Sequence, residues 1–404
     1  MNKHTQTWLT RNIFGFGVTS FFNDMSHEMT TVLLPTLIES IIGPVATPTV
    51  LGLVGGISDM VSSTLRLWAG WLSDRIAHHK ALLVFGYTLT PVFVALMGTA
   101  NHIWQIVTYR TIAWVGKGIR EPVRDAWMAD IVDSKYYGKA FGFTRALDTL
   151  GAIIGPLAVF YLLSYISVKN IFLISLIPGL CSVLALYLLV KEKVVSVRML
   201  TTQSFTHIFT QLNYLPANFR YFVGVMFLFG LGNFHKTLII FRVQEVLSAH
   251  HYSFASATGL TVLLYTFFNT IRAISEFSLG ALSDYVNRKA LLAFCGFGFF
   301  ALVSAGLLFQ FQSLLWWALI FLLAGVSTGT VTALEKAYAA DLLPAAQRGT
   351  GYGFLQALDG LADLIASVIV GLLWTYVSVT AGCLYAVCTS LGALALFYVR
   401  NKAY

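Results

Sequence analysis

Apolar runs separated by short polar breaks follow one another along almost the whole chain. A membrane-spanning helix needs about 20 mostly apolar residues. With allowance for polar side chains that face other helices, the pattern predicts twelve spanning helices in an all-α membrane protein. We place them at residues 13–38, 48–73, 80–99, 102–129, 139–165, 170–190, 219–246, 255–282, 289–310, 314–340, 349–377 and 380–399.

One longer polar segment, residues 191–218, interrupts this pattern. We interpret it as a linker between a first six-helix bundle, residues 1–190, and a second one, residues 219–404. The basic residues outside the expected spans fall almost entirely on one side of this map, with Lys169 alone on the other. Because cytoplasmic segments carry the excess of Lys and Arg, we expect a multi-pass protein of the inner membrane with a cytoplasmic linker and cytoplasmic termini.

The composition excludes a soluble domain. The 404 residues are 57% hydrophobic and 11% charged, with a mean hydropathy of +0.73, whereas soluble domains are near a quarter charged. The net charge of +8 reflects the cytoplasmic segments, so no nucleic acid partner is needed to explain it. All four cysteines lie in apolar runs without zinc-finger spacing, and we therefore expect no metal site, no disulfide framework and no cofactor.

The two halves of the chain repeat each other in parallel. Residues 69–83 are similar to 279–292, and residues 126–148 are similar to 337–359 at nearly the same separation. Three acidic residues of the first half have acidic counterparts in the second: Asp74, Asp130 and Asp148 match Asp284, Asp341 and Asp359. Two six-helix bundles related by a pseudo-twofold axis along the membrane normal form a transporter architecture, with a substrate site between them near mid-bilayer.

Several motifs carry a family resemblance. GWLSDRIAHHK (70–80) resembles the loop motif between helices 2 and 3 of the major facilitator superfamily, although it departs from that motif at Ala77 and His78. GAIIGP (151–156) is similar to the Gly-Pro motif of helix 5 in many proton-coupled antiporters. NDMSHEM, GKGIREPVRDA and FGFTRALDTLGAIIGP resemble a bacterial branch of the superfamily. The resemblance implies the major facilitator fold and transport by alternating access.

The resemblance also implies a gate on the cytoplasmic side. Asp74 is expected near Gly349, at the amino end of helix 11, where the helix dipole favours an anion. Arg75 is expected to reach Asp130. The residues with an implied gating role are Asp74, Arg75, Asp130, Asp284 and Asp341.

Charged residues inside the expected spans are the candidates for solute binding. An ionised side chain at the bilayer centre costs at least ~2.5–3.5 kcal/mol, so each needs a partner or a water-filled cavity. In the fourth span, Lys117, Arg120 and Arg124 fall within about 60° of one another on a helix, and Pro122 is expected to bend it. This basic stripe suits an anionic or zwitterionic solute, because the arginine fork matches carboxylate or phosphate. The predicted substrate-binding residues are Lys117, Arg120, Arg124, Arg145, Asn233 and Lys236.

Acidic residues on the first span are candidates for proton coupling. Asp24 and Glu28 share one helical face, and Asp148, three residues after Arg145, is the alternative acid. A substrate anion that occupies the arginines weakens their pull on a nearby carboxylate and so favours proton uptake. His27 and His235 stay open between ordinary packing and a role in coupling.

A simpler interpretation of these charges is also open. Salt bridges could account for them without any substrate, with Arg120, Arg124 and Arg145 neutralising Glu121, Asp125 and Asp148. Asp359 and Asp363, four residues apart, suit a cavity wall or a proton site. Four glycines are expected to permit close helix approach: Gly116, Gly118, Gly151 and Gly155.

These residues predict secondary active transport of a small anionic or zwitterionic organic solute, coupled to protons. We expect a monomer whose partners are solute, protons and membrane lipid. The alternative is a drug or siderophore exporter that works as a proton antiporter. A membrane receptor is less well supported because the loops are short, and we expect no enzyme because no H-E-x-x-H or G-x-G-D pattern occurs.

Overall fold

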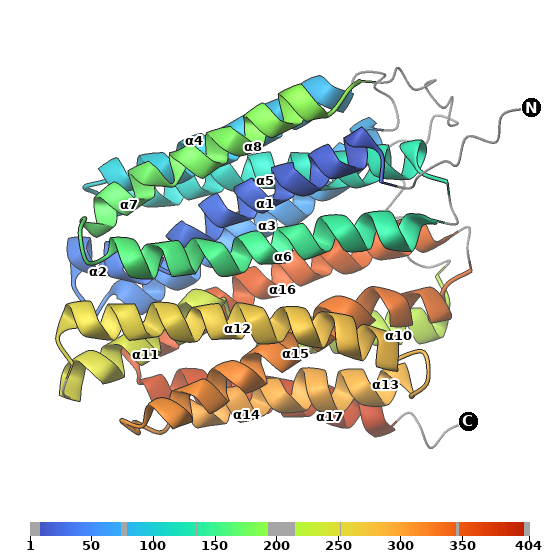
Figure 1. Ribbon diagram of the computed structural model, residues 1–404. Coiled ribbons are helices and arrows are strands. Elements are labelled where there is room, and N and C mark those ends of the chain that lie inside the picture. The colour runs from blue at the N-terminus through green and yellow to red at the C-terminus, as the bar shows by residue number, and fades with distance from the viewer. Residues whose placement is uncertain are drawn as a thin grey trace, which may run out of the picture. The chain divides into compact units, whose positions relative to one another are not determined.

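The computed structural model describes residues 9–73, 79–133, 136–192, 215–250, 252–344 and 347–399. Within those ranges all regular secondary structure is helical (Figure 1). Asp74, Arg75 and most of the expected linker lie outside the described residues. The all-helical class expected from the apolar runs is thus found in every part of the chain that the structure describes.

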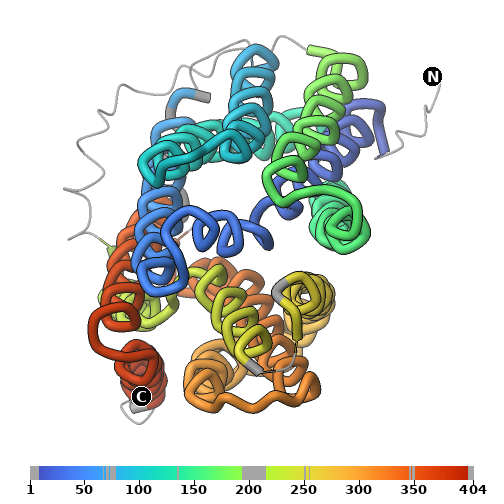
Figure 2. The backbone as a smooth tube through the Cα atoms, turned by 90° about the vertical axis from the view of Figure 1, so that its left-hand side faces the viewer, coloured from blue at the N-terminus to red at the C-terminus, as the bar shows by residue number. Residues whose placement is uncertain are grey.

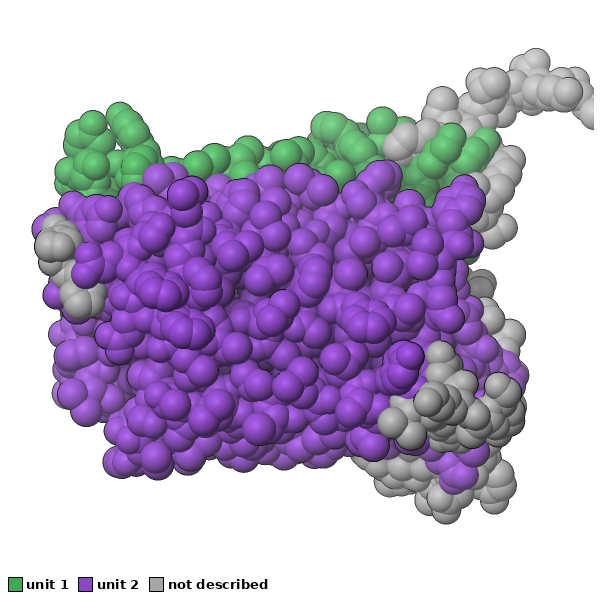
Figure 3. Space-filling view, turned by 90° about the horizontal axis from the view of Figure 1, so that it is seen from below, with its two compact units in different colours: residues 1–31, 64–100, 108–203 green, residues 32–63, 101–107, 204–404 purple. Residues whose placement is uncertain are grey.

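The chain divides into two compact units, which Figure 3 colours separately. Residues 32–63 come from the first half of the sequence but belong to unit 2. Thr36 Oγ1 donates to Gln244 Oε1 at 3.0 Å, and a Cβ added to Gly56 would lie 2.9 Å from Leu364 Cα. The ranges of unit 1 are 1–31, 64–100 and 108–203, and those of unit 2 are 32–63, 101–107 and 204–404. The units therefore differ from the two halves expected from the linker, and that division stays a prediction.

Unit 1 is built around α1, which packs on α6 and α8, while α4 packs on α8. Phe16 of α1 and Trp127 of α5 are buried in its core and meet edge to face, with ring centroids 5.4 Å apart. The helices that contribute to this unit are α1 (Arg11–Thr31), α3 (Thr47–Ser73), α4 (His79–Leu96), η1 (Met97–Thr99), α5 (Ile103–Ile131), α6 (Tyr137–Leu162), α7 (Val168–Ile174) and α8 (Leu176–Leu189).

Glycines set the short distances between helices of unit 1. A Cβ added to Gly155 of α6 would lie 2.6 Å from the carbonyl oxygen of Met25 on α1, and Gly151 meets the same helix one turn away. A Cβ on Gly116 of α5 would lie 2.7 Å from the carbonyl oxygen of Gly86 on α4. Real Cβ atoms do not fit at such distances, so the predicted close helix approach is confirmed at Gly116, Gly151 and Gly155.

Unit 2 contains most of the second half of the chain. Its helices α12 and α15 pack along each other, and Figure 2 shows them nearly end-on in yellow and orange. A π-helical stretch, η4 (Leu292–Gly298), lies between α13 and α14. The helices of this unit are α2 (Leu34–Ile42), α10 (Ala217–Gly230), α11 (Lys236–His250), α12 (Phe254–Leu282), α13 (Arg288–Leu291), α14 (Phe299–Gly306), α15 (Leu314–Leu342), α16 (Arg348–Tyr376) and α17 (Val379–Val399).

Two of the expected continuous spans are broken, which corrects the sequence prediction. The expected helix 13–38 ends at Thr31, and α2 begins anew with Pro35 in its first turn, because proline starts a helix more readily than it continues one. The expected helix 219–246 is interrupted between α10 and α11. In this break the backbone N–H of Asn233 donates to the carbonyl oxygens of Phe229 and Gly230.

Seven helices among the described residues are long and apolar enough to cross a membrane. α1, α3, α5 and α12 have 21, 27, 29 and 29 residues, which is also long enough, but they are more polar. The seven apolar candidates are His79–Thr99, Tyr137–Leu162, Val168–Leu189, Arg288–Gly306, Leu314–Leu342, Gly351–Tyr376 and Val379–Tyr398. The count of twelve spans and the pseudo-twofold relation between bundles stay predictions.

Candidate functional site

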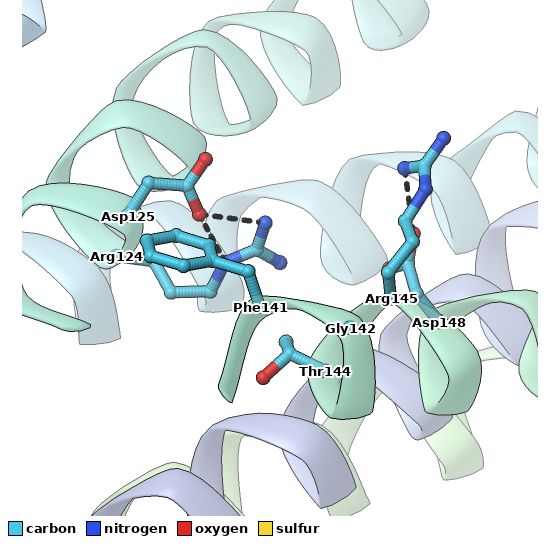
Figure 4. A pocket seen from close by; sticks show the side chains of 7 residues that line it. All are labelled: Arg124, Asp125, Phe141, Gly142, Thr144, Arg145 and Asp148. Atoms are coloured by element: carbon cyan, nitrogen blue, oxygen red, sulfur yellow. Dashed lines mark hydrogen bonds and ion pairs between the residues drawn. The ribbon is translucent and has the colours of Figure 1, made fainter. Parts of the chain in front are cut away.

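A cavity of about 360 Å³ opens between α5 and α6 in unit 1 (Figure 4). Pockets for small solutes start at about this size. The lining residues are Arg124, Asp125, Phe141, Gly142, Thr144, Arg145 and Asp148. Three of them, Arg124, Arg145 and Asp148, were predicted from the sequence as site residues, and the fold brings them together from two helices.

Two ion pairs border the cavity, and Figure 4 shows Phe141 beside the pair of Arg124 and Asp125 and Thr144 between the two pairs. Arg124 Nε and Nη2 each lie 2.9 Å from Asp125 Oδ1. Arg145 Nη1 donates to Asp148 Oδ2 at 3.2 Å. Each arginine thus has the carboxylate partner that the simpler interpretation expected, and each also borders a cavity.

Arg124 is held in place by a further contact. Its Nη1 donates to Ser20 Oγ of α1 at 2.8 Å, so that the guanidinium contacts both α1 and its own helix. A guanidinium held by several hydrogen bonds is pre-organised and loses little freedom when it binds a carboxylate. The cavity side of Arg124 is therefore presented in a fixed position.

Arg120 lies behind the cavity and does not line it. Its guanidinium is buried, donates to Asn23 Oδ1, and lies 4.9 Å from the centre of the Tyr87 ring. Lys117, one turn earlier, has its Nζ 5.4 Å from the centre of the Trp114 ring. The basic stripe of α5 thus extends from the cavity to buried contacts with α1 and α4.

Glu121 has a partner that the simpler interpretation did not name. Its Oε2 lies 2.6 Å from Nη2 of Arg66, which lies about two turns before the end of α3. The sequence placed Glu121 beside the arginines of its own helix, and only the packing of α3 on α5 shows that Arg66 neutralises it. Arg120 is then left to its contacts with Asn23 and Tyr87.

The acids predicted for proton coupling lie on α1. Glu28 is buried, and His27 Nδ1 lies 3.6 Å from its Oε1. Asp24 Oδ1 accepts a hydrogen bond from Asn23 Nδ2 at 3.2 Å. Because Asn23 Oδ1 also accepts from Arg120, Asn23 links the basic stripe of α5 to the carboxyl group of Asp24.

In unit 2, the break between α10 and α11 gathers three polar residues. Asn233 is half-buried in the break, and Lys236 Nζ lies 5.1 Å from the centre of the Tyr265 ring. His235 Nε2 lies 3.7 Å from Asp59 Oδ2 of α3, and its Nδ1 lies 2.7 Å from Thr237 Oγ1. The structure thus assigns Asn233 and Lys236 to a helix break, a setting where substrate or ion sites occur in membrane transporters.

Unit 2 contains a pair of acids, Glu335 and Asp359, of which only Asp359 was singled out from the sequence, as a candidate for a cavity wall or a proton site. The side chains of Glu335 on α15 and Asp359 on α16 are hydrogen-bonded to each other. A hydrogen bond between two carboxyl groups requires a proton on one of them. In the internal repeat, Glu335 stands at the position of Arg124 and Asp359 at that of Asp148, so the two halves carry opposite charges at the first position and an acid at the second.

The expected gating residues are only partly described. Asp74 and Arg75 lie outside the described residues, and Asp130 is exposed near the end of α5. Asp284 and Asp341 share one cation, Arg288, through contacts of 2.8 and 2.9 Å. The sequence prediction missed Arg288, although it lies in the repeat of the loop motif and could have been found there.

One short sequence motif resembles that of a serine hydrolase, but its serine has a structural role. GVSTG (325–329) fits the G-x-S-x-G pattern, which in hydrolases places an exposed serine on a strand-to-helix turn. Ser327 is instead buried in the middle of α15 and donates to the carbonyl oxygen of Gly296 at 2.7 Å. Among the described residues, no group of three or more His, Cys, Asp or Glu could hold a metal ion.

The sequence matches the family described as Major Facilitator Superfamily, over residues 16–269 and 224–403. It is 32% identical over 375 residues to an uncharacterized MFS-type transporter of Methanocaldococcus jannaschii, across 92% of this chain and 91% of that protein. The chain belongs to the major facilitator superfamily and is a multi-pass membrane transporter.

Solved structures share its fold. The nucleoside transporter NupG is similar with a TM-score of 0.75 at 11% identity, covering 97% of this chain and 99% of that chain. The D-xylose-proton symporter gives a TM-score of 0.74 at 14% identity, covering 97% of this chain and 98% of that chain.

A partial sequence similarity concerns a putative multidrug resistance protein MdtD of Salmonella typhimurium. It is 26% identical over 199 residues, 49% of this chain and 40% of that protein.

Proposed function

We propose that this transporter moves a small anionic or zwitterionic organic solute by alternating access, with proton coupling. The observation that carries the proposal is the cavity between α5 and α6, where Arg124 and Arg145 each pair with a carboxylate at the edge of an open space. Of the residues predicted to bind solute, Arg124 and Arg145 line this cavity, and Lys117, Arg120, Asn233 and Lys236 stay candidates from the sequence.

Competition for Arg145 supplies a coupling mechanism. A solute carboxylate that binds Arg145 takes the place of Asp148, whose Oδ2 lies 3.2 Å from the guanidinium. The displaced carboxylate is then mostly buried without its cation, which is unfavourable away from water. Solute binding therefore favours transfer of a proton from water to Asp148, and solute and proton are carried together.

Asp24 and Glu28 are the second proposed location for the coupling proton. Asn23 joins Arg120 to Asp24, and Arg124 contacts Ser20 of the same helix. A solute that displaces Arg124 therefore changes the charge next to α1. Glu28 is buried beside His27, and a proton there removes a buried negative charge. These contacts support a path from the cavity to the first helix.

The arrangement in the membrane follows from charge. We propose an inner-membrane protein with both termini in the cytoplasm, because basic residues outside the expected spans lie almost wholly on one side. We further propose two six-helix bundles, residues 1–190 and 219–404, each of which contributes residues to a gate on the cytoplasmic side. Its proposed residues are Asp74, Arg75, Asp130, Asp284 and Asp341.

The second candidate function is export of a drug or siderophore in exchange for protons. The identity to MdtD over 199 residues and the Gly155-Pro156 pair in α6 favour it. The similarity to a D-xylose-proton symporter favours coupled uptake instead. Both candidates use a proton gradient, and they differ in the direction in which solute and proton move.

Transport by the purified protein in liposomes separates the two candidates. Uptake of radiolabelled organic anions and zwitterions is measured with the lumen either alkaline or acidic relative to the bath. A symporter accumulates solute when the lumen is alkaline, and an antiporter accumulates it when the lumen is acidic. A protonophore should abolish accumulation in either case. No flux above that of empty liposomes in either gradient would contradict the proposal.

A further inference from the structure

The two ion pairs of the cavity differ in which partner is exposed: the carboxylate in one pair and the guanidinium in the other. In the pair on α5, Asp125 is 48% exposed and Arg124 only 16%. In the pair on α6, Arg145 is 47% exposed and Asp148 only 16%. The open surface of the cavity therefore presents one carboxylate and one guanidinium, each from a different pair.

This exposure pattern is selective for the charge of a ligand. With all four side chains ionised, the cavity has no net charge. A ligand with a single charge that binds without taking up or releasing a proton leaves an uncompensated charge, which is unfavourable in a partly buried site. A ligand with one positive and one negative group meets Asp125 with the first and Arg145 with the second, and the sum stays zero. Arg145 offers a planar fork that can hold a carboxylate through two hydrogen bonds.

The space between the pairs suits the body of such a ligand. Phe141 supplies an apolar ring beside Arg124 and Asp125, and Thr144, whose hydroxyl group donates to the carbonyl oxygen of Ala140 at 3.1 Å, lines the wall between the pairs (Figure 4). Gly142 also lines the cavity, and a Cβ added there would meet no atom within 4 Å. A longer side chain at position 142 would therefore occupy the cavity without colliding with the protein.

From these observations we infer that the cavity binds a zwitterion, with its cationic group at Asp125 and its carboxylate at Arg145. The inference rests on the proposed function and narrows its solute class. It assigns a binding role to Asp125, which neither the motifs nor the basic stripe singled out. Before the ligand binds, Arg124 and Asp148 hold their exposed partners in position through the two ion pairs.

Binding is tested on the purified full-length protein by thermal unfolding in mild detergent with matched sets of ligands. Each set contains an amino acid, the carboxylic acid that lacks its amino group and the amine that lacks its carboxyl group. The sets cover the standard amino acids and ω-amino acids of increasing chain length, in which the two charged groups are further apart. We expect at least one amino acid to raise Tm and to bind at least tenfold more tightly than its acid and its amine. An acid or amine that binds as well as the amino acid, or no stabilisation by any amino acid, overturns the inference.

Two substitutions should change charge preference in opposite directions. Asp125→Asn leaves a net positive cavity and should shift preference from the amino acid to its acid. Arg145→Gln leaves a net negative cavity and should shift preference to the amine. Equal weakening of all three ligands in both variants would indicate a structural role for the charges and overturn the assignment.

A matched pair of glycines tests whether this cavity is the site. Gly142→Leu should abolish the Tm shift because the leucine fills the cavity. Gly138→Leu, one turn earlier on α6, is the control, because a Cβ there also meets no atom within 4 Å and position 138 does not line the cavity. The inference fails if both variants bind the amino acid alike. If the amino acid binds but no flux is measured in liposomes, the zwitterion site stands and the proposed transport function is wrong. If only the acids are transported, the transport function stands and the zwitterion site is wrong.

Discussion

Arg288 Nη1 lies 2.9 Å from both carboxylate oxygens of Asp341. The contact joins the first residue of α13 to the end of α15, and Nη2 of the same guanidinium reaches Asp284 Oδ1 at 2.8 Å. In the first half of the chain, the loop motif implies the corresponding contact between Arg75 and Asp130. In the second half, Tyr285 stands in the place of that arginine, and Arg288 supplies the cation from three residues further on.

Arg288→Gln should slow transport severalfold while stability changes little. The ion pairs are partly exposed, and such pairs contribute about 1 kcal/mol or less to folding, so a gating role would appear in rate more than in Tm. Arg288→Lys is the matched control, since it keeps the charge but loses the two-point contact. Transport rates in liposomes and thermal unfolding give the comparison, and a wild-type rate for Arg288→Gln would rule out the gate.

Arg124→Ala and Arg120→Ala should fail in different ways. Arg124 borders the cavity, so its loss should abolish solute binding and leave a folded protein. Arg120 is buried on Asn23 and Tyr87, and its removal should lower the free energy of unfolding by about 2–3 kcal/mol, as expected for a lost hydrogen bond to a charged group.

The Tm of each variant without ligand measures the loss of stability, and the ligand-induced shift in Tm measures the loss of binding. Arg124→Lys and Arg120→Lys serve as conservative controls. If Arg124→Ala also fails to insert or unfolds in mild detergent, while Arg124→Lys transports normally, the charges of α5 are structural and the binding assignment is wrong.

Glu28→Gln should separate binding from coupling. The amide keeps the shape of the buried side chain but cannot take up a proton, so solute binding and solute exchange should persist while accumulation driven by a pH gradient is lost. Asp148→Asn makes the same test at the cavity, where it also removes the ion pair of Asp148 with Arg145. Retained accumulation in both variants would exclude these two acids as proton carriers.

Glu39 at the end of α2 predicts a pH dependence of stability. Burial, and then the negative charge of Glu245, raise the pKa of Glu39 above its ordinary value, although Gln244 Nε2 reaches its Oε2 at 3.5 Å. Glu245 is paired with Arg242 at 2.7 Å on α11. A raised carboxyl pKa means that the folded state binds the proton more tightly than the unfolded chain, so stability is lost as pH rises above about 4.3.

Glu39→Gln removes this loss. The variant and the wild type should have the same Tm near pH 4 and diverge toward neutral pH, with the variant more stable. Gln244→Glu places another carboxylate beside Glu39 and should steepen the decline. Parallel Tm curves for wild type and Glu39→Gln between pH 4 and pH 8 would show that Glu39 is not titrating in the folded protein over that range.

The sequence by itself determined the class of protein and the residues that carry charge into the membrane. Hydropathy is a property of short segments, so long apolar runs identify helices whatever their neighbours are. The spacing of Lys117, Arg120 and Arg124 likewise follows from helix geometry alone. The close approach at Gly151 and Gly155 could be expected for the same reason, since small residues on one face let helices meet.

Only the tertiary structure decided how the charges are paired and which of them reach open space. Arg66 lies 2.6 Å from Glu121 although 55 positions separate them in the chain, and no local pattern reports such a contact. Arg120 and Arg124 share one stripe, yet Asn23 covers the first and a cavity opens beside the second. The exposure of a side chain depends on which helices pack against it, and packing is a property of the whole fold.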